Sequence, residues 1–209
     1  MRRVRTLLDW LHEASGVAHR RRIAGADADP WQRFDIEPPL RAFGPGAEDF
    51  LGYLARPCRH SLGTPHAIAE FLLQCRYAED AHLLDEADHW LHPATFELVR
   101  SGDCEDFALW AWRQLAEARF DTVFVVGMRA IPGAVRGRHA WVLFRDAEGE
   151  YLLDGVERSV ARMIRPLPDV RDHYEPQVGV AADGRRHVYA GLYREPWGRA
   201  LRLRPTRTR

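Results

Sequence analysis

The sequence predicts an α+β fold in which helices from the first part of the chain pack on a mostly antiparallel sheet formed by the second part. Between residues 48 and 120, apolar residues recur at the three- and four-residue spacing of amphipathic helices. After residue 121 the pattern changes to β-branched and apolar runs separated by glycine-containing turns. Because the helices precede the strands instead of alternating with them, we expect segregated layers and no parallel α/β sheet.

The composition is that of an ordinary globular domain. The chain has 209 residues, of which 46% are apolar and 29% charged, and this length is sufficient for one domain with a hydrophobic core. The formal net charge is zero, so bulk electrostatics do not indicate nucleic acid as a partner. All 30 basic residues are arginine, which excludes chemistry that needs a lysine amine.

The three cysteines are Cys58, Cys75 and Cys104. Their number is odd and no CxxC pair is present, so the sequence predicts neither a disulfide framework nor a zinc site. Cys75 continues the apolar stripe of an expected helix, where a packed thiol is the usual role. A reducing compartment fits this cysteine usage, and the cytoplasm is the expected location.

Both ends of the chain are basic, with a net charge of +4 over residues 1–22 and +5 over residues 194–209. Such ends either bind anionic surfaces or remain solvated tails. Residues 3–19 have the pattern of an amphipathic helix, and charged residues interrupt its apolar face, so it does not read as a signal peptide. No apolar run approaches the length of a membrane span. Residues 24–47 are rich in proline and glycine and form either a linker or a strap over the core.

Helices are expected at residues 48–56, 65–83, 84–98 and 103–120. Pro65 suits the first turn of the second of these helices. Gly102 breaks the chain before the last one, Asp103 is a good N-cap, and Asp106 lies at the position that completes a capping box.

Strands are expected at residues 122–127, 139–144 and 150–154, and a last hairpin at residues 178–194. If the second and third strands form a hairpin through residues 145–150, facing residues have numbers that sum to about 295. The numbers of His139 and Asp154 sum to 293, so their side chains should lie close together across the two strands.

Cys104 lies between acidic residues at the expected start of a helix. Neighbouring carboxylates disfavour the thiolate, which is the reactive form of cysteine. The helix N-terminus acts in the opposite direction, because its unpaired N–H groups favour an anion, and we expect it to lower the thiol pKa. His139 is a candidate general base and Asp154 a candidate for orienting its ring. Each residue alone also fits a structural role.

The motif Gly102-Asp-Cys-Glu-Asp-Phe-Ala108, followed by His139-Ala-Trp on a strand and by Leu153-Asp154, resembles the bacterial transglutaminase-like cysteine proteinases. These belong to the wider transglutaminase-like, papain-related superfamily. The gaps from cysteine to histidine and from histidine to aspartate are 35 and 15 residues, as in the family. Residues 90–93 also resemble its tryptophan–proline stretch. The match covers residues 66–156.

The resemblance implies a papain-like core and a catalytic triad of Cys104, His139 and Asp154. Attack of the sulfur on an amide carbonyl would give a thioester acyl-enzyme. The backbone N–H of Cys104 is the natural first donor to the oxyanion. The indole of Trp90 and the amide of Gln74 are candidates for the second donor. The alternative is that Trp90 belongs to the core and Gln74 to the surface.

This chemistry requires no cofactor. Some relatives with the acidic motif are calcium-dependent, and carboxylates suit a hard cation. The resemblance therefore makes Asp103 and Glu105 candidate calcium ligands. The alternative role of these carboxylates is capping of the helix and favourable interaction with its dipole, which we expect for Asp103 and Asp106.

The sequence thus predicts a cysteine peptidase or amidase that acts on a peptide or protein substrate. Two alternatives remain: an acyltransferase, in which an amine takes the place of water, and a non-catalytic binding module on the same fold. Many family members are exported to the periplasm, but no export signal is visible here, so that role is not carried over. The expected organisation is an N-terminal helix and strap (1–64), a catalytic core (65–195) and a basic tail (196–209).

Overall fold

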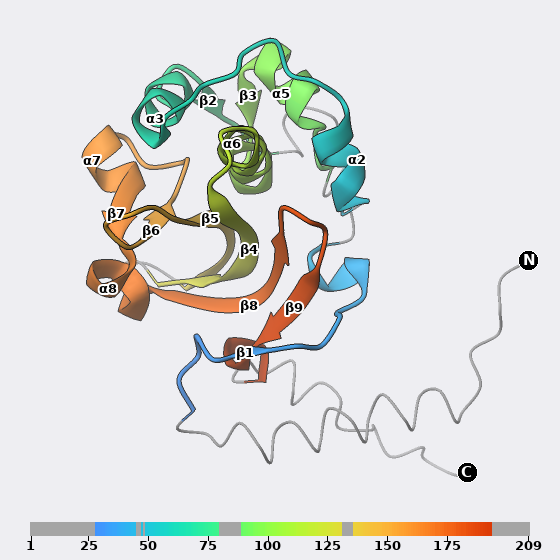
Figure 1. Cartoon of the computed structure of the whole chain (residues 1–209), viewed down its shortest axis with the longest axis vertical. Helices are drawn as coiled ribbons and strands as arrows, with labels where there is room; N and C mark the ends of the chain where they lie inside the picture. The colour runs from blue at the N-terminus through green and yellow to red at the C-terminus, as the bar shows by residue number, and fades with distance from the viewer. Residues whose placement is uncertain (1–27, 45–46, 48, 80–88, 131–135, 194–209) are drawn as a thin grey trace, which may run out of the picture.

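The computed structural model describes residues 28–44, 47, 49–79, 89–130 and 136–193, and it confirms the α+β class (Figure 1). In these residues the main sheet has seven strands in the order β1-β9-β8-β4-β5-β6-β7, and each neighbouring pair is antiparallel. The strands are β1 (Arg33–Phe34), β4 (Asp121–Arg129), β5 (Gly137–Arg145), β6 (Glu150–Leu153), β7 (Ile164–Pro166), β8 (Tyr174–Ala181) and β9 (Arg186–Tyr189).

The hairpin of β5 and β6 has the predicted register. Leu143 faces Leu152, and Phe144 faces Tyr151. The predicted last hairpin is also present, because β8 and β9 pair directly. Its turn contains Gly184 at φ +83°, in the left-handed region that favours glycine. The turn-forming residues of the sequence therefore predicted both hairpins correctly.

Helix α6 (Cys104–Glu117) is the centre of the helical layer and lies between the sheet and helices α2, α3 and α5 (Figure 1). It has the predicted capping box of Asp103 and Asp106, and residues 106–115 are all buried. It ends three residues before the predicted end at Phe120. The other helices are α2 (Phe50–Ala55), α3 (Pro65–Leu72), α5 (Pro93–Val99), α7 (Val160–Met163) and α8 (Leu167–Val170), with 3-10 turns η1 (Leu40–Ala42), η2 (Arg171–His173) and η3 (Ala190–Tyr193).

The predicted helix over 65–83 is wrong for residues 73–79, and residues 80–83 lie outside the described residues. The chain turns after Leu72 and forms β2 (Arg76–Tyr77), which pairs in parallel with β3 (Ser101–Gly102). The backbone N–H of Arg76 donates to the carbonyl of Arg100 at 2.9 Å. Helical periodicity is a local signal, and these long-range backbone hydrogen bonds override it.

The predicted helix over 84–98 is described from residue 89 onwards; it is wrong for residues 89–92, which are not helical, and confirmed from Pro93. Residues 80–88 lie outside the described residues. The helix that follows, α5, begins at Pro93 and has His92 as its N-cap, whose Nδ1 accepts the N–H of Ala94 at 3.1 Å.

One hydrophobic core fills the space between α6 and the sheet, and residues before position 65 contribute to it. Phe43, Phe50 and Tyr53 are buried in the same cluster as the aromatic residues of α6, and β1 extends the main sheet. Cys75 is also buried there, as expected. The strap is therefore partly built into the core, and the division at residue 64 stays a prediction.

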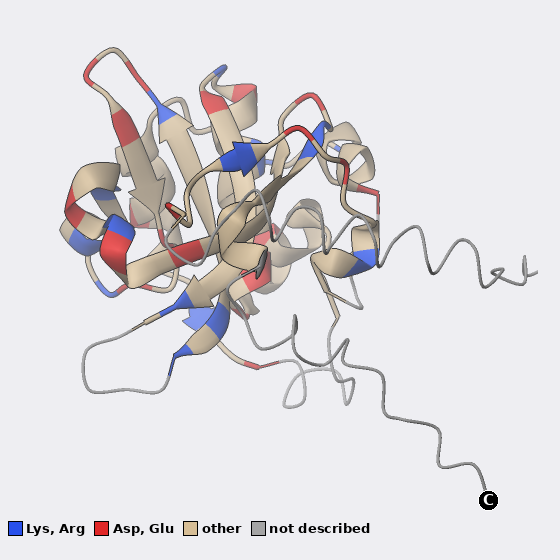
Figure 2. Cartoon of the chain, turned by 90° about the horizontal axis from the view of Figure 1, so that it is seen from below, with Lys and Arg blue, Asp and Glu red and all other residues tan. Residues whose placement is uncertain are grey.

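The surface has no single dominant charge. Basic and acidic residues are interspersed over the part of the chain that is described (Figure 2), in line with the formal net charge of zero. None of the helices found in the described residues has the length and apolar character needed to cross a membrane.

Candidate active site

Gly102 and Asp106 fix the start of α6 and with it the position of Cys104. A Cβ atom on residue 102 would collide with the Asp106 carboxylate, so only glycine fits there. That buried carboxylate accepts the backbone N–H of Asp103 at 3.2 Å and that of Leu91 at 2.7 Å. The Gly-Asp-Cys-Glu-Asp pattern therefore ties the helix start to the preceding segment and makes Cys104 the first residue of α6.

The sulfur of Cys104 lies beside the edge of β5. It donates to Oε2 of Glu105 at 3.1 Å. The backbone N–H of Ala140 is close enough to act against the rise of the thiol pKa. Ala140 directly follows His139 in β5, so the sulfur lies near the part of the strand that carries His139.

His139 and Asp154 meet as the register predicted. Nε2 of His139 lies 2.9 Å from Oδ2 of Asp154, and both side chains are buried. Asp154 directly follows the last residue of β6. Because Nε2 is engaged with the carboxylate, Nδ1 is the ring nitrogen left for a proton acceptor role. The ring also stacks on Trp141, with centroids 6.3 Å apart.

Asp154 has two further partners that the sequence analysis did not identify. The hydroxyl of Tyr174 donates to Oδ2 at 2.7 Å, and Nη1 of Arg129 lies 2.9 Å from the same oxygen. Arg129 also pairs with Glu157. Three donors therefore converge on one carboxylate oxygen. Arg129 and Tyr174 lie at the end of β4 and the start of β8, which pair with each other.

These partners keep Asp154 ionised. Burial by itself would raise the pKa of this carboxyl, but His139, Arg129 and Tyr174 together hold the pKa of Asp154 below its usual range. A buried carboxylate with its charge compensated in this way can orient an imidazole and stabilise the imidazolium.

The expectation of a lowered thiol pKa at Cys104 is wrong for this structure. Burial is the main cause that raises the pKa of the Cys104 thiol well above its usual value, and the Glu105 carboxylate is the next. The helix N-terminus is present, but Glu105 receives the thiol hydrogen bond, and a neighbouring negative charge disfavours the thiolate.

The thiol and the imidazole make no direct hydrogen bond. Within the described residues, the Cys104 sulfur donates to Glu105, and the Nε2 of His139 is bound to Asp154. The predicted contact between sulfur and imidazole therefore stays a prediction. Catalytic hydrogen bonds are often long or poorly aligned when no substrate is bound.

The two candidates for the second oxyanion donor have other surroundings. Trp90 is buried and packs edge-on against Phe50 and Phe124, with ring centroids 6.2 and 5.7 Å apart. Gln74 is exposed, and its amide donates to the carbonyl of Glu70 at 3.3 Å and accepts from Arg100 at 3.2 Å. These contacts favour a core role for Trp90 and a surface role for Gln74. An oxyanion role for either residue stays a prediction.

A calcium site does not assemble from the described residues. They contain no group of three or more His, Cys, Asp or Glu side chains that could hold a metal ion. Glu105 receives the Cys104 thiol, and each carboxylate oxygen of Asp106 accepts a backbone N–H group. Calcium takes six to eight oxygen ligands, so Asp103 and Glu105 alone do not fit it, and no chemical step below depends on a metal.

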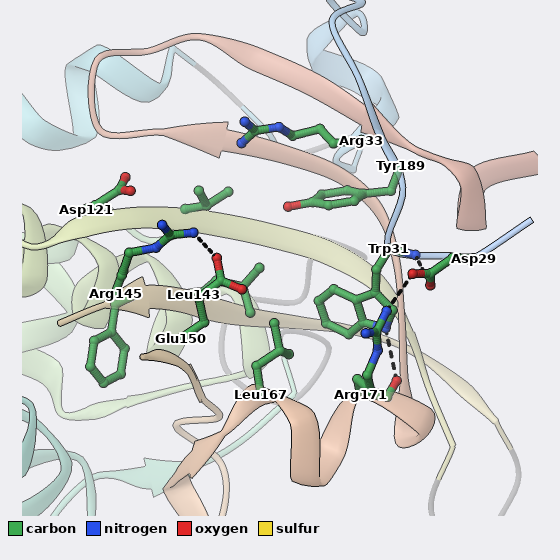
Figure 3. A pocket seen from close by; sticks show the side chains of 12 residues that line it. Asp29, Trp31, Arg33, Asp121, Leu143, Arg145, Glu150, Leu167, Arg171 and Tyr189 are labelled. Atoms are coloured by element: carbon green, nitrogen blue, oxygen red, sulfur yellow. Dashed lines mark hydrogen bonds and ion pairs between the residues drawn. The ribbon is translucent and has the colours of Figure 1, made fainter. Parts of the chain in front are cut away.

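A cavity of about 570 Å³ lies over the face of the sheet that carries Leu143 and Tyr189 (Figure 3). Among its charged lining residues, Arg145 pairs with Glu150, and Arg171 pairs with Asp29 at 2.6 Å. Leu143 belongs to its floor. None of the predicted site residues lines this cavity, so it is separate from the candidate active site.

Comparisons with known proteins give distant structural likenesses. No protein-family model and no curated protein matches the chain. Among solved structures, Legionella pneumophila LapG is 20% identical over 68% of this chain and 74% of its own, with a TM-score of 0.47. Its calcium-bound form is 18% identical over 83% and 87%, also at 0.47. A candidate cysteine protease from Cytophaga hutchinsonii is 12% identical over 61% and 45%, at 0.40.

Identities of 12–20% and TM-scores below 0.5 are too low to assign an activity. The functional proposal therefore depends on the geometry around Cys104, His139 and Asp154.

Proposed function

We propose that this protein is a cysteine peptidase or amidase in which Cys104 is the nucleophile, His139 the general base and acid, and Asp154 the residue that orients the imidazole. The observation that carries the proposal is the 2.9 Å hydrogen bond between buried His139 and Asp154, next to Ala140, whose backbone N–H is close enough to Cys104 to influence its pKa. A thiol, an imidazole and a carboxylate in this order are the components of nucleophilic acyl transfer.

The proposed reaction begins with a rotation of the Cys104 side chain from Glu105 towards His139. Nδ1 of His139 takes the thiol proton while the sulfur attacks the carbonyl carbon of an amide. The N–H groups at the start of α6 stabilise the negative oxygen of the tetrahedral intermediate. The imidazolium then protonates the leaving amine, and a thioester remains on Cys104. Attack of water on the thioester, assisted by His139, releases the acid and restores the thiol.

Substitution of the two reacting residues tests this mechanism. Cys104→Ala and His139→Ala are each expected to abolish cleavage of a mixed peptide library, read by mass spectrometry, while circular dichroism shows an intact fold. Cys58→Ala is the matched control, because it removes a partly exposed thiol outside the site. Cleavage by the Cys104→Ala variant would refute the proposal.

A second measurement identifies whether water or an amine accepts the acyl group. Adding a fluorescent primary amine to the same digest tests whether the thioester passes to amines. Free acids as the products support a peptidase. Conjugates that require Cys104 support the acyltransferase alternative, which shares every step up to the thioester. Binding of peptides with neither cleavage nor conjugation would support the alternative of a non-catalytic binding module.

Calcium dependence through Asp103 and Glu105 is tested in the same assay. The described residues do not form a complete calcium site, so we expect equal activity in calcium and in EGTA. An activity lost in EGTA, restored by calcium and absent in Glu105→Gln would support the calcium prediction.

A further inference from the structure

A small cavity lies next to the proposed catalytic residue His139, which is part of its lining. It has a volume of about 290 Å³ and is lined by Tyr77, Arg129, Gly137, Arg138, His139, Val156 and Arg158. This volume is at the lower end of the range for ligand pockets, which suits a single side chain of a bound peptide better than a separate cofactor.

The cavity is lined by three arginines and by no acidic residue. Arg129 is neutralised by Asp154 and Glu157. Arg138 donates to the carbonyl oxygens of Ala42 and Phe43, which are uncharged, so its positive charge is not compensated.

Arg158 is the arginine that remains available to a ligand. It is exposed and makes no ion pair or hydrogen bond within the part of the chain that the structure describes. Its neighbour Glu157 is engaged by Arg129 and Arg162. The lining residues therefore present uncompensated positive charge beside the imidazole, while the carboxylates of Asp103, Glu79 and Glu105 lie outside the lining, near Tyr77.

Tyr77 connects this cavity with the nucleophile. Its ring lines the cavity and is close enough to Cys104 and Asp103 that, after burial, their charges are the next causes that raise the pKa of the Tyr77 hydroxyl. A peptide bound across Cys104 would thus place a neighbouring side chain between Tyr77 and the arginines.

We propose that this cavity selects substrates with an Asp or Glu side chain close to the amide that is cleaved, and that Arg158 is the residue that binds the carboxylate. The guanidinium group can bind a carboxylate through two parallel hydrogen bonds. Val156 and the ring of Tyr77 provide apolar contacts for the aliphatic part of the side chain. The inference rests on the proposed function, because it assumes that the cleft binds a peptide.

A binding measurement separates this inference from the proposed chemistry. The Cys104→Ala protein is titrated with two pools of random heptapeptides that differ only in Glu or Gln at the central position. We expect the Glu pool to bind about tenfold more tightly at low ionic strength, and the difference to shrink as salt is added. Equal binding of the two pools would overturn the inference, even if the wild-type protein cleaves peptides.

Variants of Arg158 identify the residue responsible. In the Cys104→Ala background, Arg158→Gln should remove the preference, and Arg158→Glu should make a Lys pool bind better than the Glu pool. Arg145→Gln is the matched control, since Arg145 is also exposed but pairs with Glu150 at the other cavity, and it should retain the preference. A preference that survives both Arg158 substitutions would overturn the assignment.

Cleavage gives an independent check on the two claims. If the wild-type protein cleaves peptides with no enrichment of Asp or Glu near the bond, the selectivity fails and the proposed function stands. If the Glu pool binds better but nothing is cleaved, the proposed function fails and the acid-binding cavity stands.

Discussion

The Cys104 thiol and the Asp154 carboxylate, the two ends of the proposed triad, face different groups. On the thiol side, Glu105 accepts the hydrogen bond that the sulfur donates, and Asp103 directly precedes Cys104 in the chain. On the imidazole side, Arg129 and the Tyr174 hydroxyl both bind the Asp154 oxygen that also holds His139. The two sides therefore have opposite effects on protonation: the pKa of the Cys104 thiol is raised, and the pKa of the Asp154 carboxyl is lowered.

This difference separates the two parts of the proposed mechanism. Asp154 is ionised before the reaction starts and needs no further change. The sulfur keeps its proton until a base takes it, so the structure favours general-base transfer over a thiolate that is already present in the resting protein. Changes on the imidazole side should act on catalysis and stability, and changes on the thiol side should act on the reactivity of the sulfur.

Among the substitutions that test this difference, Asp154→Asn should have the largest effect on the rate of peptide cleavage. It removes the charge that orients and stabilises the imidazolium and leaves Arg129 without one of its two carboxylates. We expect the rate of peptide cleavage to fall about 10³- to 10⁴-fold, as for other triads that lose this charge. The measurement is kcat on a peptide that the wild-type protein cleaves. Asp172→Asn, an exposed acid, is the control, and a rate within a few-fold of wild type for Asp154→Asn would refute the triad.

Arg129→Gln should mainly reduce stability. It leaves a fully buried carboxylate without its cation, and breaking a buried pair costs about 3–5 kcal/mol, less here because Tyr174 and His139 remain bound. The lowered pKa of Asp154 means that the ionised pair contributes its stability above the usual carboxyl range. That contribution is lost as the pH falls through the lowered pKa of the folded state.

Denaturant unfolding at a series of pH values tests this effect. The free energy of unfolding of Arg129→Gln should lie furthest below that of wild type near pH 7, and the two should converge in acid, where Asp154 is protonated. Arg162→Gln is the control, because Arg162 also pairs with Glu157 but its side chain is 66% exposed, and surface pairs contribute little. A difference that is constant with pH would show that Arg129 acts by packing and not by its charge.

The parts of the site that depend on local signals could be predicted from the sequence. The start of α6 follows from Gly102 and the capping box, which act within four residues. The meeting of His139 with Asp154 follows from the register of a short hairpin, because a tight turn fixes which residues face each other. The α+β class follows from the change of hydrophobic period near residue 121.

The parts that depend on long-range contacts could not be predicted. Arg129 and Tyr174 reach Asp154 only because β8 pairs with β4, and no spacing in the sequence marks that pair. The parallel pairing of β2 with β3 ended a helix that local periodicity favoured. At Cys104, the helix N-terminus was identified correctly, but burial of the thiol, followed by the Glu105 carboxylate, raises its pKa, and burial by the folded chain is not visible in the local sequence.

Glu105→Gln should make the sulfur more reactive. Removing the carboxylate that accepts the thiol hydrogen bond lowers the pKa of Cys104 towards its usual value, and each unit of decrease raises the thiolate fraction at pH 7 about tenfold. The rate of alkylation by iodoacetamide, measured between pH 6 and 9 and assigned to Cys104 by peptide mapping, gives this shift directly. Glu79→Gln provides a control, since it removes a nearby charge without removing the hydrogen bond. An unchanged rate would mean that burial alone controls the thiol.

Tyr174→Phe should have the smallest effect, because it removes one of the three side-chain donors to Oδ2 of Asp154 and leaves the packing in place. The ring still contacts Trp141, with centroids 5.2 Å apart, and the Arg129 guanidinium still lies over it at 5.5 Å. Loss of one hydrogen bond to a charged group costs about 1.5–3 kcal/mol when the site cannot compensate. Here His139 and Arg129 compensate, so we expect kcat to fall about two- to fivefold. Tyr189→Phe is the control, since Tyr189 packs in the same cluster and has no bond to Asp154. A loss as large as that of Asp154→Asn would mean that Tyr174 directs the carboxylate, and Arg129 would then be the secondary partner.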